Sequence, residues 1–121
     1  MAKTILYVDD STTMVMSVKS TLEMNGFKVE TAGDGEAAYA KLKAGLKPDL
    51  IITDINMPKM NGIELIKQVK SLPGFRFTPI LTLTTEGSSD RRDEAKKLGA
   101  TGWLVKPFDP KKLVDVVNLE K

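Results

Sequence analysis

The stretch from Leu50 to Gly62, LIITDINMPKMNG, decides the fold of this chain. An apolar, β-favouring run leads to one acid, Asp54, and the chain then turns through a proline and an Asn-Gly pair. This pattern is typical of a buried strand that presents an acid at its C-terminal end, followed by a loop and a helix. We therefore expect Asp54 at the edge of a parallel sheet, where open α/β folds carry their chemistry.

Four more strands are predicted around this one, and a helix is predicted after each strand. The predicted strands are Ile5–Val8, Phe27–Ala32, Leu50–Thr53, Pro79–Thr84 and Thr101–Val105. The helices begin at residues that cap helix N-termini, namely Ser11-Thr12, Asp34, Asn61, either Ser88 or Ser89, and Asp109. Strict alternation indicates a parallel sheet with helices on both faces. We expect one domain over residues 1–121 with a flavodoxin-like (βα)5 doubly wound fold, its five strands in the order 2-1-3-4-5.

The composition excludes several kinds of chemistry. The 121 residues include no cysteine and no histidine, which rules out disulfides, thiol nucleophiles, imidazole ligands and Ser-His-Asp triads. A net charge of +2 does not argue for nucleic-acid binding. No apolar run approaches the ~20 residues that a membrane span needs, and no secretory segment opens the chain, so we expect a cytoplasmic protein.

Five polar side chains are predicted to meet at the C-terminal edge of the sheet: Asp9, Asp10, Asp54, Thr84 and Lys106. Two carboxylates at about 4 Å repel by roughly 4 kcal/mol at an effective dielectric near 20, so the acids need a cation or a proton. Mg²⁺ is suited to carboxylates, water and phosphate oxygens. With a lysine and a hydroxyl beside it, this set predicts phosphoryl transfer in which Asp54 attacks phosphorus in line. Lys106 would balance phosphoryl charge, and the Thr84 hydroxyl would donate a hydrogen bond.

Each of these residues also has a simpler explanation. Asp9, Asp10 and Asp109 are suited to capping helices, Thr84 to an ordinary strand position and Lys106 to a solvated charge. Their joint placement at the strand ends favours the functional interpretation.

Two other classes of protein share parts of this pattern. A Mg²⁺-dependent phosphatase with an Asp nucleophile usually carries Asp-x-Asp on its first strand, which Asp9-Asp10-Ser11 does not match. A flavodoxin binds phosphate after its first strand, where an Asp pair would repel it.

The chain resembles a response-regulator receiver domain over essentially its whole length. The matching residues are Asp9-Asp10, the segment Asp54–Gly62, Thr84 and Lys106-Pro107. The resemblance implies that Asp54 accepts a phosphoryl group from the phosphohistidine of a sensor histidine kinase. It also implies that Mg²⁺ is held by Asp10, Asp54 and the backbone carbonyl of Asn56, with Asp9 supporting the metal through water.

The resemblance extends to positions that tune and transmit the signal. Asn56 and Glu86 match positions that influence phosphate loss in the chemotaxis regulators of the family. Trp103 occupies the aromatic switch position, which is usually Tyr or Phe. Its ring either moves inward as Thr84 shifts, or simply fills a gap beside the neighbouring helix. Both hypotheses stay open.

Because no output domain follows the last predicted helix, we expect the output to be protein binding. We also expect a monomer that catalyses only its own phosphorylation and dephosphorylation. Basic residues gather near that end of the domain: Arg91, Arg92, Lys96, Lys97, Lys111 and Lys112. A charge run is usually a solvated face, but the resemblance favours docking of an acidic peptide from a flagellar motor switch protein. The alternative within the family is a phosphate sink or relay intermediate.

Overall fold

The computed structural model describes residues 3–54, 62–75, 77–84, 93, 96–105 and 110–120. Its strands are β1 (Thr4–Val8), β2 (Lys28–Ala32), β3 (Leu50–Asp54), β4 (Ile80–Thr84) and β5 (Gly102–Val105). Its helices are α1 (Thr12–Met24), α2 (Gly35–Lys43), α3 (Gly62–Ser71) and α5 (Pro110–Glu120). The helix predicted to begin at Ser88 falls largely outside the described residues.

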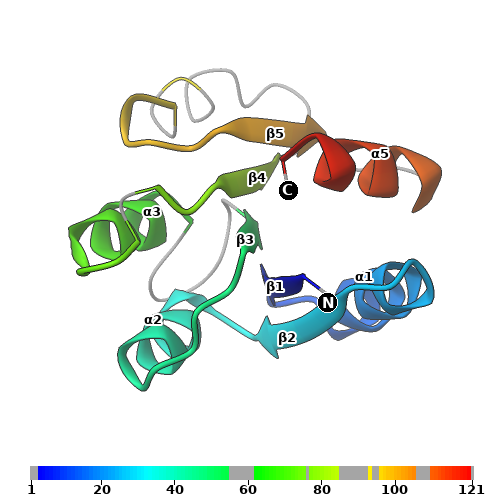
Figure 1. The fold of residues 1–121 in the computed structure, drawn as a ribbon, viewed down its shortest axis with the longest axis horizontal. Helices are drawn as coiled ribbons and strands as arrows, with labels where there is room; N and C mark the ends of the chain where they lie inside the picture. The colour runs from blue at the N-terminus through cyan, green and yellow to red at the C-terminus, as the bar shows by residue number, and fades with distance from the viewer. Residues whose placement is uncertain are drawn as a thin grey trace.

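The strands form one parallel sheet in the order β2-β1-β3-β4-β5. Figure 1 shows α2 and α3 on one face of the sheet and α1 and α5 on the other. The predicted flavodoxin-like, doubly wound fold is therefore confirmed. Since all the strands run the same way, their C-terminal ends lie at one edge of the sheet.

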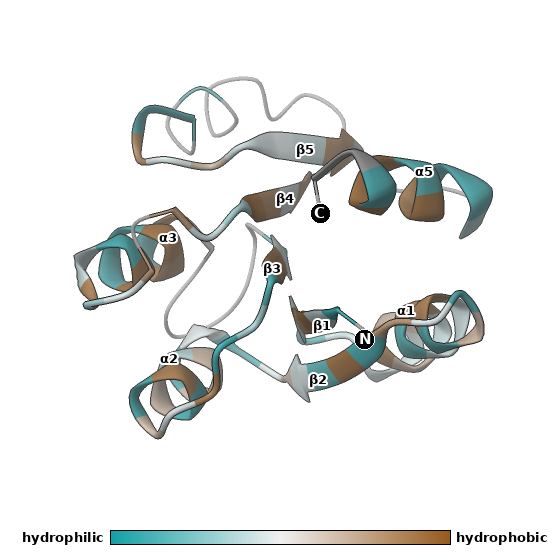
Figure 2. Ribbon diagram, viewed as in Figure 1, coloured by the Kyte–Doolittle hydropathy of each residue, from teal (hydrophilic) through white to brown (hydrophobic). Residues whose placement is uncertain are grey.

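The core consists of two apolar clusters, one on each face of the sheet. Successive strand residues point to opposite faces, so Leu6 of β1 packs with the cluster under α2 and α3, while Ile5 and Tyr7 pack with the cluster under α1 and α5. Figure 2 shows apolar stretches on the helices that cover each face. Full burial of a side chain of this size contributes about 1.5 to 3 kcal/mol.

Two of the predicted helix caps are confirmed. The Ser11 hydroxyl accepts a hydrogen bond from the backbone N–H of Met14 at 3.3 Å, and the Asp34 carboxylate accepts one from Ala37 at 2.8 Å. The first cap starts α1 two residues after Asp10, which keeps the connection from β1 short. None of the helices in the described part of the chain is long and apolar enough to cross a membrane.

Candidate functional site

Three acids meet at the C-terminal edge of the sheet. Asp9 directly follows β1, and Asp54 is the last residue of the neighbouring strand β3. One carboxylate oxygen from each of Asp9, Asp10 and Asp54 lies within 4.8 Å of the others. Asp9 is 1% exposed and Asp54 is 6% exposed, whereas Asp10 is open to solvent. The predicted convergence of the acids is confirmed for these three residues.

Hydrogen bonds from two directions orient the Asp9 carboxylate. Its Oδ1 accepts from the backbone N–H of Ser11 at 3.0 Å, and its Oδ2 accepts from the Tyr7 hydroxyl at 2.6 Å. The backbone N–H of Asp9 donates to the carbonyl of Ala32 at the end of β2. Because Ser11 is the N-cap of α1, helix capping does not explain the presence of Asp9 or Asp10.

Tyr7 is a site residue that the sequence pattern did not identify. Its side chain is 0% exposed, and burial raises the pKa of its phenol, with further increases from the hydrogen bond to Asp9 and the charges of Asp9 and Asp54. The hydroxyl therefore stays protonated at neutral pH and acts as a hydrogen-bond donor to Asp9. A usable signal was present in the sequence, because residues two apart in a strand face the same side and Tyr7 precedes Asp9 by two.

The spacing of the acids suits a small divalent cation. Magnesium–oxygen distances are about 2.0 to 2.1 Å, so ligands on opposite sides of the ion lie about 4.2 Å apart. Oxygens within 4.8 Å of one another reach that separation through small rotations, which the exposed Asp10 allows. Asp9 and Asp10 also line a pocket of about 220 Å³ between the start of α1 and the end of β2, which leaves room for water.

Several predicted site residues lie outside the part of the chain that the structure describes: Asn56, Glu86, Arg91, Arg92 and Lys106. Thr84 is the last residue of β4 and pairs with Val105 of β5, which places its backbone at the same edge as the acids. The Thr84 side chain falls outside the description. The roles assigned to these residues stay predictions.

Trp103 lies on β5 opposite Thr82 of β4. Its neighbour Leu104 belongs to the cluster under α1 and α5, so the Trp103 side chain points to the other face of the sheet. The indole is 44% exposed and, with Lys96 and Thr82, lines a pocket of about 100 Å³. The two hypotheses for this side chain both stay open.

Four of the six predicted basic surface residues are described, and all four are exposed: Lys96, Lys97, Lys111 and Lys112. They come from the segment before β5 and from the first turn of α5.

The fold and the acidic edge are those of a receiver domain. The model of the response regulator receiver domain family matches residues 5–118, and the chain belongs to this family. It is 43% identical over 116 residues to the chemotaxis protein CheY1 of Helicobacter pylori, a match that covers 95% of this chain and 94% of that protein. It is 38% identical to the chemotaxis protein CheY of Thermotoga maritima, with 98% and 97% of the two chains covered. The solved structure of the Vibrio cholerae chemotaxis protein CheY4 superposes with a TM-score of 0.95 at 45% identity over all of both chains.

Proposed function

We propose that this chain is a phosphoacceptor response regulator of a two-component system, with Asp54 as the acceptor. The observation that carries the proposal is the cluster of three carboxylates, in which Asp54 is nearly buried at the tip of a central strand. A carboxylate held among other acids is a poor phosphate-binding group without a cation, whereas the same arrangement is suited to phosphoryl transfer with one.

The cation is Mg²⁺ in this proposal, held by Asp10, Asp54 and the backbone carbonyl of Asn56, with Asp9 supporting it through water. The three oxygens within 4.8 Å support a small, hard ion. When bound, the ion neutralises charge on the acids and on the phosphoryl oxygens.

In the proposed reaction, an oxygen of Asp54 forms a bond to phosphorus while the bond between phosphorus and the histidine nitrogen of a sensor kinase breaks. The electron pair of that bond stays with the imidazole, and the product is an acyl phosphate. Lys106 pairs with the phosphoryl group, and the Thr84 hydroxyl donates to one of its oxygens. Asn56 and Glu86 influence how fast the phosphate is lost. The chain catalyses only its own phosphorylation and dephosphorylation.

The output in this proposal is phosphorylation-dependent binding of an acidic peptide, such as one from a flagellar motor switch protein. The exposed lysines of α5 and of residues 96–97 support this choice, as does the likeness to chemotaxis proteins. The chain acts as a cytoplasmic monomer, and residues 1–121 form one receiver domain. Coupling between sites is typically about 1 to 3 kcal/mol, so the unphosphorylated form binds weakly rather than not at all.

The test is incubation with Mg²⁺ and acetyl phosphate, followed by intact mass and Trp103 fluorescence. We expect the mass of one phosphoryl group on the wild type and none on Asp54→Asn. The control is Asp115→Asn, which removes the same charge from an exposed position on α5 and should be phosphorylated normally. An acid-stable, base-labile phosphate on the Asp54→Asn protein would overturn the assignment.

A further inference from the structure

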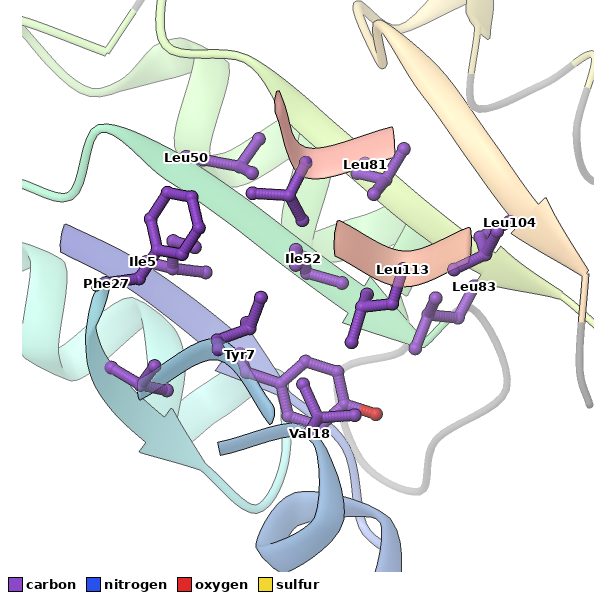
Figure 3. Packing of buried hydrophobic residues seen from close by; sticks show 13 residues of the cluster. Ile5, Tyr7, Val18, Phe27, Leu50, Ile52, Leu81, Leu83, Leu104 and Leu113 are labelled. Atoms are coloured by element: carbon purple, nitrogen blue, oxygen red, sulfur yellow. The ribbon is translucent and has the colours of Figure 1, made fainter. Parts of the chain in front are cut away.

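Tyr7 places a polar group where the surrounding cluster needs none. The ring lies on β1 between Thr31 of β2 and Ile52 of β3. It belongs to the cluster under α1 and α5, and Figure 3 shows it beside Val18 of α1. An aliphatic side chain would fill such a site, and a buried hydroxyl is costly unless it is hydrogen-bonded. The hydroxyl of Tyr7 is bonded to Asp9.

The hydrogen bond between Tyr7 and Asp9 is of the strong kind. Its length of 2.6 Å falls in the range of about 2.5 to 2.7 Å that is typical of a hydroxyl donating to a charged oxygen. The donor is held by a ring without solvent contact, so it cannot turn away from the carboxylate. The N–H of Ser11 holds the other oxygen from the start of α1.

We propose that Tyr7 is a positioning residue for the divalent-cation site, holding the Asp9 carboxylate in one orientation beside Asp10 and Asp54. Each carboxylate oxygen has about two lone pairs, so the oxygen bonded to Tyr7 keeps one that is not directed at the phenol. The site is thus arranged before the cation arrives, although the acids repel one another. The inference rests on the proposed function and adds a residue that acts through Asp9 rather than on the phosphoryl group.

Hydrogen-bond partners of the groups that ligate a metal are typically worth about 10- to 100-fold in metal affinity, and we expect the lower end of this range because Asp9 supports the ion through water in the proposed site. The Tyr7→Phe protein keeps the ring and loses only the hydroxyl. We expect it to bind Mg²⁺ about tenfold more weakly than the wild type in calorimetric titrations of the metal-free proteins. The matched control is Tyr39→Phe, because Tyr39 of α2 packs against the cluster on the other face of the sheet. Its Mg²⁺ affinity should equal that of the wild type.

A second readout separates positioning from general damage to the fold. With acetyl phosphate, Tyr7→Phe should be phosphorylated slowly at limiting Mg²⁺ and at the wild-type rate once Mg²⁺ is saturating, since Asp54 is untouched. A third readout needs no variant at Tyr7: Mg²⁺ should produce a tyrosine signal in the near-ultraviolet difference spectrum of Tyr39→Phe, whose remaining tyrosine is Tyr7.

The outcomes distinguish this inference from the proposed function. If the wild type binds Mg²⁺ and is phosphorylated, but Tyr7→Phe binds the metal equally well, the positioning role is wrong and the proposed function stands. A Tyr7→Phe protein that stays slow at saturating Mg²⁺ also contradicts the positioning role, because the defect would then not act through the metal. A wild type that neither binds Mg²⁺ nor gains phosphate overturns both.

Discussion

Without divalent cations, the Asp54→Asn protein should be more stable than the wild type. Asp54 and Asp9 are both buried, with oxygens no more than 4.8 Å apart. At an effective dielectric near 20 this separation corresponds to a repulsion of about 3.5 kcal/mol. Asp10 adds less because solvent screens it. An amide accepts hydrogen bonds at one oxygen instead of two, which takes back about 1 to 2 kcal/mol and leaves a net gain of about 2 kcal/mol.

The assay is urea unfolding followed by circular dichroism, first with a chelator and then with Mg²⁺. A gain of about 2 kcal/mol raises the midpoint of urea unfolding by roughly 0.7 to 2 M, at m values of about 1 to 3 kcal/mol/M. In Mg²⁺ at about 100 times its Kd the wild type gains about 2.7 kcal/mol, because the ion binds the folded state. The asparagine variant, with one acid fewer, gains less. We therefore expect the advantage of the asparagine variant, about 2 kcal/mol, to disappear when Mg²⁺ is added, and the order of stability to reverse if the variant gains less than about 0.7 kcal/mol.

Asp115→Asn is the control, since it changes the net charge equally at an exposed position on α5. Its stability should stay within about 0.5 kcal/mol of the wild type in both buffers. An Asp54→Asn protein that is less stable than the wild type in chelator would refute the reasoning, because the acids would then not strain the metal-free fold. If Asp54→Asn and Asp115→Asn are stabilised equally in chelator, the reasoning is also refuted, since the effect would then come from net charge alone.

The remaining predictions concern pH and partner binding. Above pH about 10 the unfolded chain loses the proton of Tyr7, whereas the folded chain keeps it because its pKa is raised. The free energy of unfolding of the wild type should therefore fall by about 1.4 kcal/mol per pH unit relative to that of Tyr7→Phe. At pH 7 to 9 the difference between the two proteins should not depend on pH. If the two free energies stay parallel at every pH, the phenol ionises equally in the folded and unfolded states, and the prediction is wrong. An acidic peptide should bind about 5- to 150-fold more tightly once Mg²⁺ and acetyl phosphate are present. The affinity of the peptide should fall as salt is added, and it should be lower for the Lys111→Ala protein. If the phosphorylated and unphosphorylated proteins bind the peptide equally well, the result favours a role as phosphate sink or relay intermediate.

The strand order and the meeting of the acids were predictable because they depend only on the succession of elements. A parallel sheet brings the C-terminal ends of its strands to one edge, even when a predicted strand boundary is wrong by one or two residues. The prediction ended the third strand at Thr53, whereas β3 includes Asp54. That difference does not move the acid away from Asp9, since β1 and β3 are neighbours in the sheet.

The spacing of Tyr7 and Asp9 indicates that they face the same side of the strand, but the hydrogen bond between them was not predictable by the same reasoning. The apolar run that contains Tyr7 predicts that it lies on a strand and in the core, and the structure confirms both. Whether its hydroxyl reaches a partner depends on the rotamer of the ring, which packing against α1 determines. The exposure of Trp103 was unpredictable for a similar reason. Whether a residue on an edge strand is covered depends on what packs against it, and the spacing of apolar residues in the sequence does not show this.

Tyr7 couples the core to the site. The ring is packed in the cluster under α1 and α5, and its hydroxyl reaches a carboxylate at the sheet edge (Figure 3). Since interiors are close-packed, a shift of the ring large enough to break a 2.6 Å hydrogen bond would require its neighbours in the cluster to move. The orientation of Asp9 is therefore determined by the central strand and its packing, not by a loop. A carboxylate held in this way keeps its place while the charge around it changes, as the proposed cation site requires when Asp54 gains a phosphoryl group.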